Sequence, residues 1–173
     1  MALITKQPTS FTHPDPSYGG SVTVAGQSNT GHGTTSVAAG SPNPASANAS
    51  MRWTGFQNVS GQILQKTLKV NYSAAAGGGV GPGIAREFTL EYSLNGGANW
   101  SIAFQDLDFT GSIVNALFSL NLANNQDLTQ VQVRDNAAAS VGNPAEELAD
   151  ISFSVANIRI EVVTSEAQLV VVL

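Results

Sequence analysis

Three aspartates are the residues best placed by type and spacing to bind a metal ion or do acid–base chemistry. Asp106 and Asp108, in QDLDF, would point to the same side of a strand, and Asp127 could approach them. Such oxygen ligands suit Ca²⁺, but no loop carries the dense ligand run of a known calcium motif. Two carboxylates could also serve a glycosidase. The simpler interpretation is solvated carboxylates beside buried Leu107 and Phe109, so we expect no metal and no cofactor, with calcium as the alternative.

Nucleophilic catalysis has little support in the sequence. The histidines, His13 and His32, both lie in a segment rich in Pro, Gly, Ser and Asn, whereas a Ser–His–Asp device needs its base held rigidly. The absence of cysteine excludes thiol catalysis, disulfides and cysteine metal sites. Glu146 and Glu147 fit an exposed helical turn. We therefore expect no catalytic residues and no enzyme.

Aromatic residues could form a platform on which a sugar ring stacks. The candidates are Tyr18, Trp53, Phe56 and Trp100. However, Trp53 alternates with Met51, and Trp100 fits the inward face of its strand. Both tryptophans are therefore expected in the core.

The chain is poor in charge, and this excludes several kinds of partner. Charged residues make up 11% of the chain, against about 25% in typical domains. Seven scattered Lys and Arg residues and a net charge of −5 disfavour nucleic acid and anionic membrane surfaces. The N-terminus does not look like a signal peptide, and no apolar run reaches the ~20 residues that span a bilayer. A neutral polar surface suits β-structure and surfaces that other subunits cover.

Alternating apolar and polar residues predict strands over 67–73, 87–94, 100–104 and 128–135. The residues expected to point toward the core include Phe88, Leu90, Trp100, Ile102, Phe104, Val131 and Val133. Residues 112–122 fit a strand better than a helix, with a helical turn as an option at their start. In 151–163 the apolar residues change parity near Ala156 and Asn157, which predicts a β-bulge or a strand crossing between sheets. Seven to nine short strands predict an all-β fold, an antiparallel, jelly-roll-like β-sandwich.

The chain divides into two parts by composition. Residues 1–50 predict an extended, loop-rich arm with one short strand in GGSVTVAG, and residues 51–173 predict the β-sandwich domain. Within the sandwich, residues 73–85 (SAAAGGGVGPGIA) fit a flexible glycine loop, and residues 143–150 (NPAEELAD) fit a short helix.

One short motif stands out, the hairpin in LEYSLNGGANWSIAF, residues 90–104. Ser93, Asn95, Gly97 and Trp100 fit the spacing S-x-D-x-G-x-x-W, with Asn in place of Asp. The hairpin resembles the Asp-box of sialidase-like propellers over eight residues, and the chain has no second copy. In that family the box is a structural turn, so the resemblance implies a structural hairpin. Asn and Gly also supply the positive φ angles of a tight connection, with Trp100 closing the core beside it.

Both ends of the chain carry apolar residues that are expected to make contacts in an assembly. Leu3, Ile4 and Phe11 lie in the predicted arm. A strand that is apolar on both faces belongs in the middle of a sheet or under a partner chain, because at an open edge it would aggregate. This description fits the end of the chain: Leu169, Val170, Val171, Val172 and Leu173.

In size, composition, arm and strand layout the chain resembles small β-sandwich structural proteins of bacteriophage particles, such as capsid decoration or tail proteins. This resemblance implies a non-enzymatic assembly protein of the virion that binds copies of itself or other virion proteins. One alternative is a carbohydrate-binding or adhesin-like module of a secreted protein, at the cell surface and with a glycan ligand. Another is an extracellular fibre subunit that uses donor-strand exchange.

Overall fold

The computed structural model describes residues 1–13, 17–18, 21–27, 29–37, 45–79, 83–142 and 149–165, the side chains of 17–18, 21–25, 27 and 45 excepted. These ranges form β-strands and one short 3-10 helix, η1 (Leu128–Gln130). The strands are β1 (Ala2–Lys6), β2 (Ser10–Thr12), β3 (Ser17–Tyr18), β4 (Ser21–Gln27), β5 (Thr30–Val37), β6 (Ala45–Thr54), β7 (Ile63–Gly78), β8 (Ile84–Ser93), β9 (Ser101–Asp106), β10 (Ser112–Leu122), β11 (Gln132–Val141) and β12 (Ala149–Thr164).

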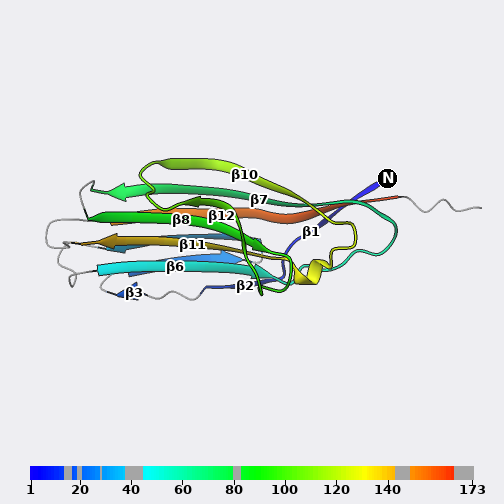
Figure 1. Ribbon diagram of the computed structural model, residues 1–173, viewed down its shortest axis with the longest axis horizontal. Coiled ribbons are helices and arrows are strands. Elements are labelled where there is room, and N and C mark those ends of the chain that lie inside the picture. Colours follow the sequence, from blue (N-terminus) through cyan, green and yellow to red (C-terminus); the bar gives the residue numbers. More distant parts are fainter. Residues whose placement is uncertain are drawn as a thin grey trace, which may run out of the picture.

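Two antiparallel sheets form the two layers of an elongated sandwich (Figure 1). Sheet A has the strand order β10-β7-β12-β5-β4, with β1 also paired to β12. Sheet B has the order β2-β6-β11-β8-β9, with β3 also paired to β6. Each strand thus leaves one face for the core and one for the surface, which is why the sequence alternates.

The connectivity of β5 to β12 is that of a jelly roll. The hairpin β8–β9 lies in sheet B, and the pair that encloses it in sequence, β7–β10, lies in sheet A. The next enclosing pair, β6–β11, lies in sheet B, and the outermost pair, β5–β12, lies in sheet A. One long, nested hairpin is thus folded so that successive pairs alternate between the two sheets. The predicted all-β, jelly-roll-like sandwich is confirmed.

The core lies between the sheets and is built from every second residue of the central strands. Met51 and Trp53 of β6, expected in the core, are fully buried, as are Phe88 and Leu90 of β8. Burial of one such side chain contributes about 1.5–3 kcal/mol to folding. The period of two in the sequence therefore identifies most of the core.

The predicted bulge in 151–163 is confirmed. The register between β12 and β7 shifts between Ala156 and Arg159, and Asn157 has φ +50°. The extra residue on β12 shifts the alternation of inward and outward side chains by one position. Apolar residues on both sides of the bulge therefore face the core. The buried residues are Ile151, Phe153, Val155, Ile158, Ile160 and Val162.

Residues 112–122 form a strand, β10, with no helical turn at its start. Instead, the register with β7 shifts between Ile113 and Ala116, and Asn115 has φ +48°. The backbone N–H of Asn115 donates to Ser73 Oγ at 2.9 Å. The helical spacing seen at the start of this stretch therefore reflects a β-bulge.

The expectation of one short strand in residues 1–50 is wrong, because this segment contributes to both sheets. The strand in GGSVTVAG exists as β4, but β1, β2, β3, β5 and the first half of β6 are also present. Gly31 shows why composition misled: a Cβ there would lie 2.6 Å from Met51 Sδ and 2.7 Å from Trp53 Cζ2. The glycine makes room for large side chains of the facing sheet, a role that composition alone cannot distinguish from a loop.

We expect Gly31→Val to lower the free energy of unfolding by about 1–3 kcal/mol, because the added methyl groups overpack the core against Met51 and Trp53. Urea unfolding measures this difference. Gly111→Ala is the matched control, since a Cβ at Gly111 meets nothing within 4 Å. Equal midpoints for the two variants would show that the space around Gly31 is not limiting.

The glycine loop is shorter than predicted. β7 continues to Gly78 and β8 begins at Ile84, so most of 73–85 is strand. Small residues are required here because β7 lies beside β12: a Cβ at Gly77 would lie 1.9 Å from Asp150 Oδ1. The predicted helix at 143–150 falls on 143–148, outside the described residues, and on Ala149 and Asp150, which begin β12.

The inward placement of Trp100 and Ile102 is also wrong. The register between β8 and β9 shifts between Leu90 and Glu91, which leaves Ala103 as an extra residue on β9. Ile102 therefore stands opposite Glu91 and is 56% exposed, while Phe104 stays opposite buried Leu90. A bulge reverses which residues face the core, and a short alternating run does not reveal it.

Candidate functional site

The hairpin between β8 and β9 is held together by its own side chains. Ser93 Oγ accepts the backbone N–H groups of Asn95 at 3.3 Å and Gly97 at 2.9 Å, and its hydroxyl donates to Asn95 Oδ1 at 2.9 Å. Asn95 Oδ1 also accepts the N–H of Asn99 at 2.9 Å. Gly97 has φ +89°, a conformation that suits glycine. These polar groups serve the turn itself.

Trp100 lies on the outer face of sheet B beneath two arginines. The guanidinium carbon of Arg134 is 4.1 Å from the ring centroid, and that of Arg52 is 5.5 Å away. Arg134 Nε also forms an ion pair with Glu91 Oε2 at 2.6 Å, and Arg52 Nε donates to Gln132 Oε1 at 2.9 Å. Arginine thus covers a face of the indole ring on which a sugar would have to stack.

Two of the other aromatic candidates do not form a platform with Trp100. Trp53 and Phe56 are buried in the core. The side chain of Tyr18 lies outside the described residues.

The candidate calcium ligands are not brought together. Among the described residues no group of three or more His, Cys, Asp or Glu side chains could hold a metal ion. Asp106 Oδ1 accepts the N–H of Asp108 at 3.0 Å in a local turn, and Leu107 between them is exposed rather than buried. Asp127 caps η1, and hydrogen bonds from Thr129 and then Asn58 lower the pKa of its carboxyl group. Phe109 is buried as expected.

The two histidines lie in different parts of the sandwich. His13 follows β2 and packs against Phe11 in a tilted arrangement, with ring centroids 5.5 Å apart. His32 is exposed on β5 in sheet A, opposite Ser154 of β12. Glu146 and Glu147 lie outside the described residues.

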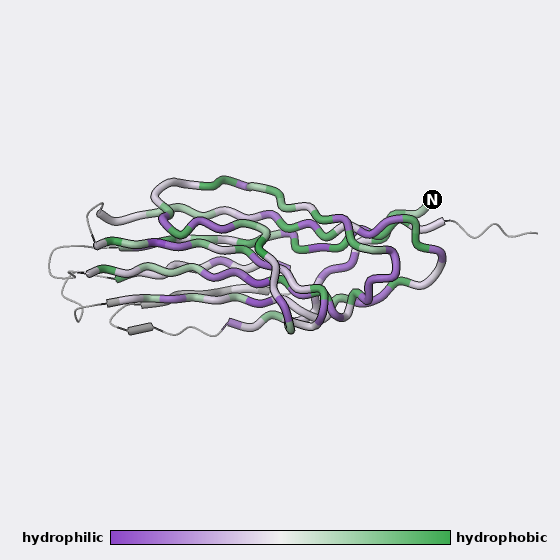
Figure 2. Tube along the Cα trace, in the orientation of Figure 1, coloured by the Kyte–Doolittle hydropathy of each residue, from purple (hydrophilic) through white to green (hydrophobic). Residues whose placement is uncertain are grey.

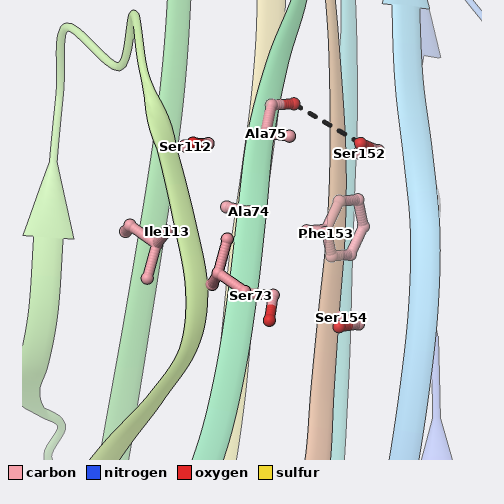
Figure 3. A pocket seen from close by; sticks show the side chains of 9 residues that line it. Ser73, Ala74, Ala75, Ser112, Ile113, Ser152, Phe153 and Ser154 are labelled. Carbon is pink, nitrogen blue, oxygen red and sulfur yellow. Dashed lines mark hydrogen bonds between the residues drawn. The ribbon is translucent and has the colours of Figure 1, made fainter.

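A depression of about 320 Å³ opens on sheet A where β10, β7 and β12 run side by side (Figure 3). Ser152 Oγ donates to the carbonyl oxygen of Ala75 at 3.5 Å along this surface. None of the lining side chains is charged, and most of them are serine or alanine. The depression therefore offers few anchoring groups for a small molecule. They belong to Ser73, Ala74, Ala75, Ser112, Ile113, Val114, Ser152, Phe153 and Ser154.

Among the described residues, sequence reasoning missed three buried ionisable side chains, those of Asp135, Arg86 and Lys66. Asp135 is fully buried between the sheets; its Oδ1 accepts the N–H of Met51 at 2.9 Å, and its Oδ2 has no hydrogen-bond partner. Burial raises the pKa of this carboxyl group to about 8. Val131 and Val133 are inward-facing residues of an alternating run, and the same alternation places residue 135 on the inward side. This was the signal in the sequence that could have identified Asp135 as buried.

Arg86 is the second of these residues. It is buried at the end of the sandwich where β7 and β12 meet, and its guanidinium binds backbone carbonyls. Arg86 Nε donates to Asp150 O at 2.9 Å, and one terminal nitrogen donates to Gly79 O at 2.6 Å and to Gly77 O. This arginine ties strands of both sheets together.

Exposed large apolar side chains gather in two places. Met1, Leu3 and Leu64 lie where β1, β12 and the start of β7 meet. The others follow the side of the sandwich formed by the edge strands β9 and β10, and we call Ile102, Leu107, Val114 and Leu117 the β9–β10 edge. Figure 2 shows the apolar stretch of β10 along the upper border of the molecule. Val114 is 83% exposed and Leu117 54%.

The residues predicted to make assembly contacts lie in different environments. Leu3 is 65% exposed on β1. Ile4 packs against the core of its own chain, and Phe11 packs on Trp53 with ring centroids 5.5 Å apart. The apolar residues 169–173 lie outside the described residues. Within the described part of the chain, no helix has the length and apolarity to cross a membrane.

Comparisons with known proteins place the chain in no family. No family model matches it, and no curated protein matches it. Among solved structures it is similar to the enzymatically active domain of tailspike protein 4 from bacteriophage CBA120, with 12% identity, a TM-score of 0.36, and coverage of 88% of this chain and 19% of that one. It is also similar to a chain of infectious bursal disease virus, Gt strain, with 10% identity, a TM-score of 0.27, and coverage of 93% of this chain and 36% of that one. The chain thus spans about a fifth and about a third of these proteins, and likenesses this slight carry no conclusion about its function.

Proposed function

We propose that the chain is a non-enzymatic structural subunit of a repeating assembly. The observation that carries this proposal is the place of its exposed apolar side chains, which lie on edge strands and at one end of the sandwich. Edge strands present unpaired backbone groups, and apolar side chains beside them favour pairing with another chain. Isolated proteins usually protect such edges with charge, yet β10 carries no charged residue.

The scarcity of charge supports the same proposal. Covering a protein surface requires the removal of water from its polar groups, and charged groups cost most. With 11% charged residues, large areas of this chain can be covered at low cost. The serine- and alanine-rich surface of sheet A beside β10 is an example.

The finer part of the proposal is that the assembly is a virion and that the chain is a capsid decoration or tail component. Its partners would be copies of itself or other virion proteins. Support comes from the resemblance in composition and layout described above and from the jelly-roll connectivity, which is an architecture used by viral capsid proteins. Contacts would involve Leu3 on β1 and the segment 169–173.

Sedimentation velocity and electron microscopy of the purified chain test the proposal. We expect trimers, rings, lattices or filaments whose fraction grows with protein concentration, because apolar edges must be covered by other copies. A discrete monomer up to the solubility limit, and one that binds sugars on a glycan array, would contradict the proposal in favour of a carbohydrate-binding module.

A further inference from the structure

The outer edge of β10 has the properties of a strand-docking site. Among the described residues β10 hydrogen-bonds to β7 alone, so the backbone groups on its other side point away from the sheet. From Ala116 to Leu122 the register with β7 is regular, beyond the bulge at Ile113. This stretch is therefore straight enough to accept another strand.

Several side chains along this stretch are only partly covered, although Leu122 at its end is buried. Leu117 is exposed on the outer face. On the inner face Phe118 and Leu120 are only half-buried, although Phe118 stacks on Tyr92 with ring centroids 5.4 Å apart. A strand added here would extend the core on one face and cover Leu117 on the other, so it should be apolar on both faces.

We propose that the segment Gln168–Leu173 of a second copy pairs with the Ala116–Leu122 edge of β10, an inference that rests on the proposed function. Five consecutive apolar residues follow Gln168, so this segment is apolar on both faces. Neither it nor β10 contains a charged residue, so pairing buries no charge. Backbone hydrogen bonds would supply direction, and the alternating side chains would supply register.

Chain length shows why the segment must come from another copy to pair with this edge as far as Ala116. β12 ends at Thr164, opposite Ile63 on β7, whereas Ala116 stands opposite Tyr72. At about 3.3 Å per residue, Ile63 and Tyr72 are ~30 Å apart along the strand. The segment must also cross β7 and β10, roughly 14 Å more at ~4.8 Å per strand. Residues 165–173 extend at most about 32 Å, so within their own chain they cannot pair along the whole Ala116–Leu122 edge.

Cysteine cross-linking tests the pairing, since the chain has no cysteine of its own. Ser119→Cys, on the exposed face of β10, is mixed under oxidising conditions with full-length Val171→Cys. We expect a mixed disulfide dimer at about tenfold the yield of the control pair Thr12→Cys with Val171→Cys, because docking raises the local thiol concentration. Equal yields would overturn the inference. So would an intramolecular disulfide in the double variant, which would show that the segment reaches its own β10.

Two variants of the chain, each checked for folding, separate this inference from the proposed function. Deletion of 168–173 and Leu117→Lys should reduce the assembled fraction equally, whereas Thr34→Lys, at an exposed position on the inner strand β5, should leave it unchanged. Thermal melting confirms that each variant is folded. Assembly that survives both changes would overturn strand docking while leaving the structural role in place. A wild-type chain that stays monomeric would overturn the structural role itself.

Discussion

Asp135→Asn is expected to stabilise the protein at pH above 8 by several kcal/mol. The pKa of the Asp135 carboxyl group is raised from 3.8 to about 8 in the folded protein, so at high pH folding holds a bare carboxylate between the sheets. Asparagine has nearly the same shape and carries no charge. Its Oδ1 can still accept the N–H of Met51, which donates to Asp135 Oδ1 at 2.9 Å.

The direction of the pH dependence follows from which state binds the proton. Between about pH 4 and pH 8 the folded protein keeps the Asp135 proton and the unfolded chain releases it. Stability therefore falls as the pH rises through this range, by up to about 1.4 kcal/mol per pH unit, and levels off above the folded pKa. Most buried carboxylates in ion pairs show the opposite trend. Below pH 4 the acid is neutral in both states, so the wild type and the Asp135→Asn variant should differ by about 1 kcal/mol or less.

Urea unfolding of the wild type and Asp135→Asn from pH 4 to pH 9 measures this difference. Comparing the two chains cancels the contributions of all other titrating groups. Asp108→Asn, which makes the same substitution at an exposed aspartate, is the control. Parallel profiles for wild type and Asp135→Asn would show that the Asp135 carboxyl group does not titrate between the folded and unfolded states.

Arg86→Leu should lower the free energy of unfolding by about 1–3 kcal/mol or more, because it leaves buried carbonyl oxygens without a hydrogen-bond donor. The substitution removes hydrogen bonds to the carbonyl oxygens of Gly77, Gly79 and Asp150. Gly77 lies on β7, Gly79 directly follows β7, and Asp150 lies on β12. Leucine offers no hydrogen-bond donor to these three oxygens. Arg86→Lys should recover only part of the loss, because an ammonium group cannot match the planar fork of the guanidinium.

Arg159→Leu is the matched control for Arg86. Arg159 forms an ion pair with Glu161 at 3.0 Å, but its side chain is 25% exposed. Its loss should cost about 1 kcal/mol or less, because solvent screens the pair. Chemical denaturation gives both values, and similar losses at the two positions would refute the role of Arg86 in holding the two sheets together.

Much of the fold could be predicted from the sequence because a half-buried strand must alternate. Phe88 and Leu90 were assigned to the core by this rule, and both are buried. The change of parity near Asn157 predicted the bulge in β12 for the same reason. The hairpin at Ser93–Gly97 also depends on local chemistry, since its side chains bond to backbone groups a few residues away.

What the sequence could not determine depends on contacts between residues far apart in the chain. Gly31 and Gly77 suggest loops by composition, but both lie in strands. Side chains of the facing sheet at Gly31, and Asp150 of β12 at Gly77, occupy the space that a Cβ would need. Trp100 and Ile102 face outward because of one extra residue at Ala103. Asp135 and Arg86 are ordinary charged residues until the second sheet covers them. Local periodicity therefore determined the strands, whereas the packing of one sheet on the other decided which ionisable residues are buried and which edges remain open.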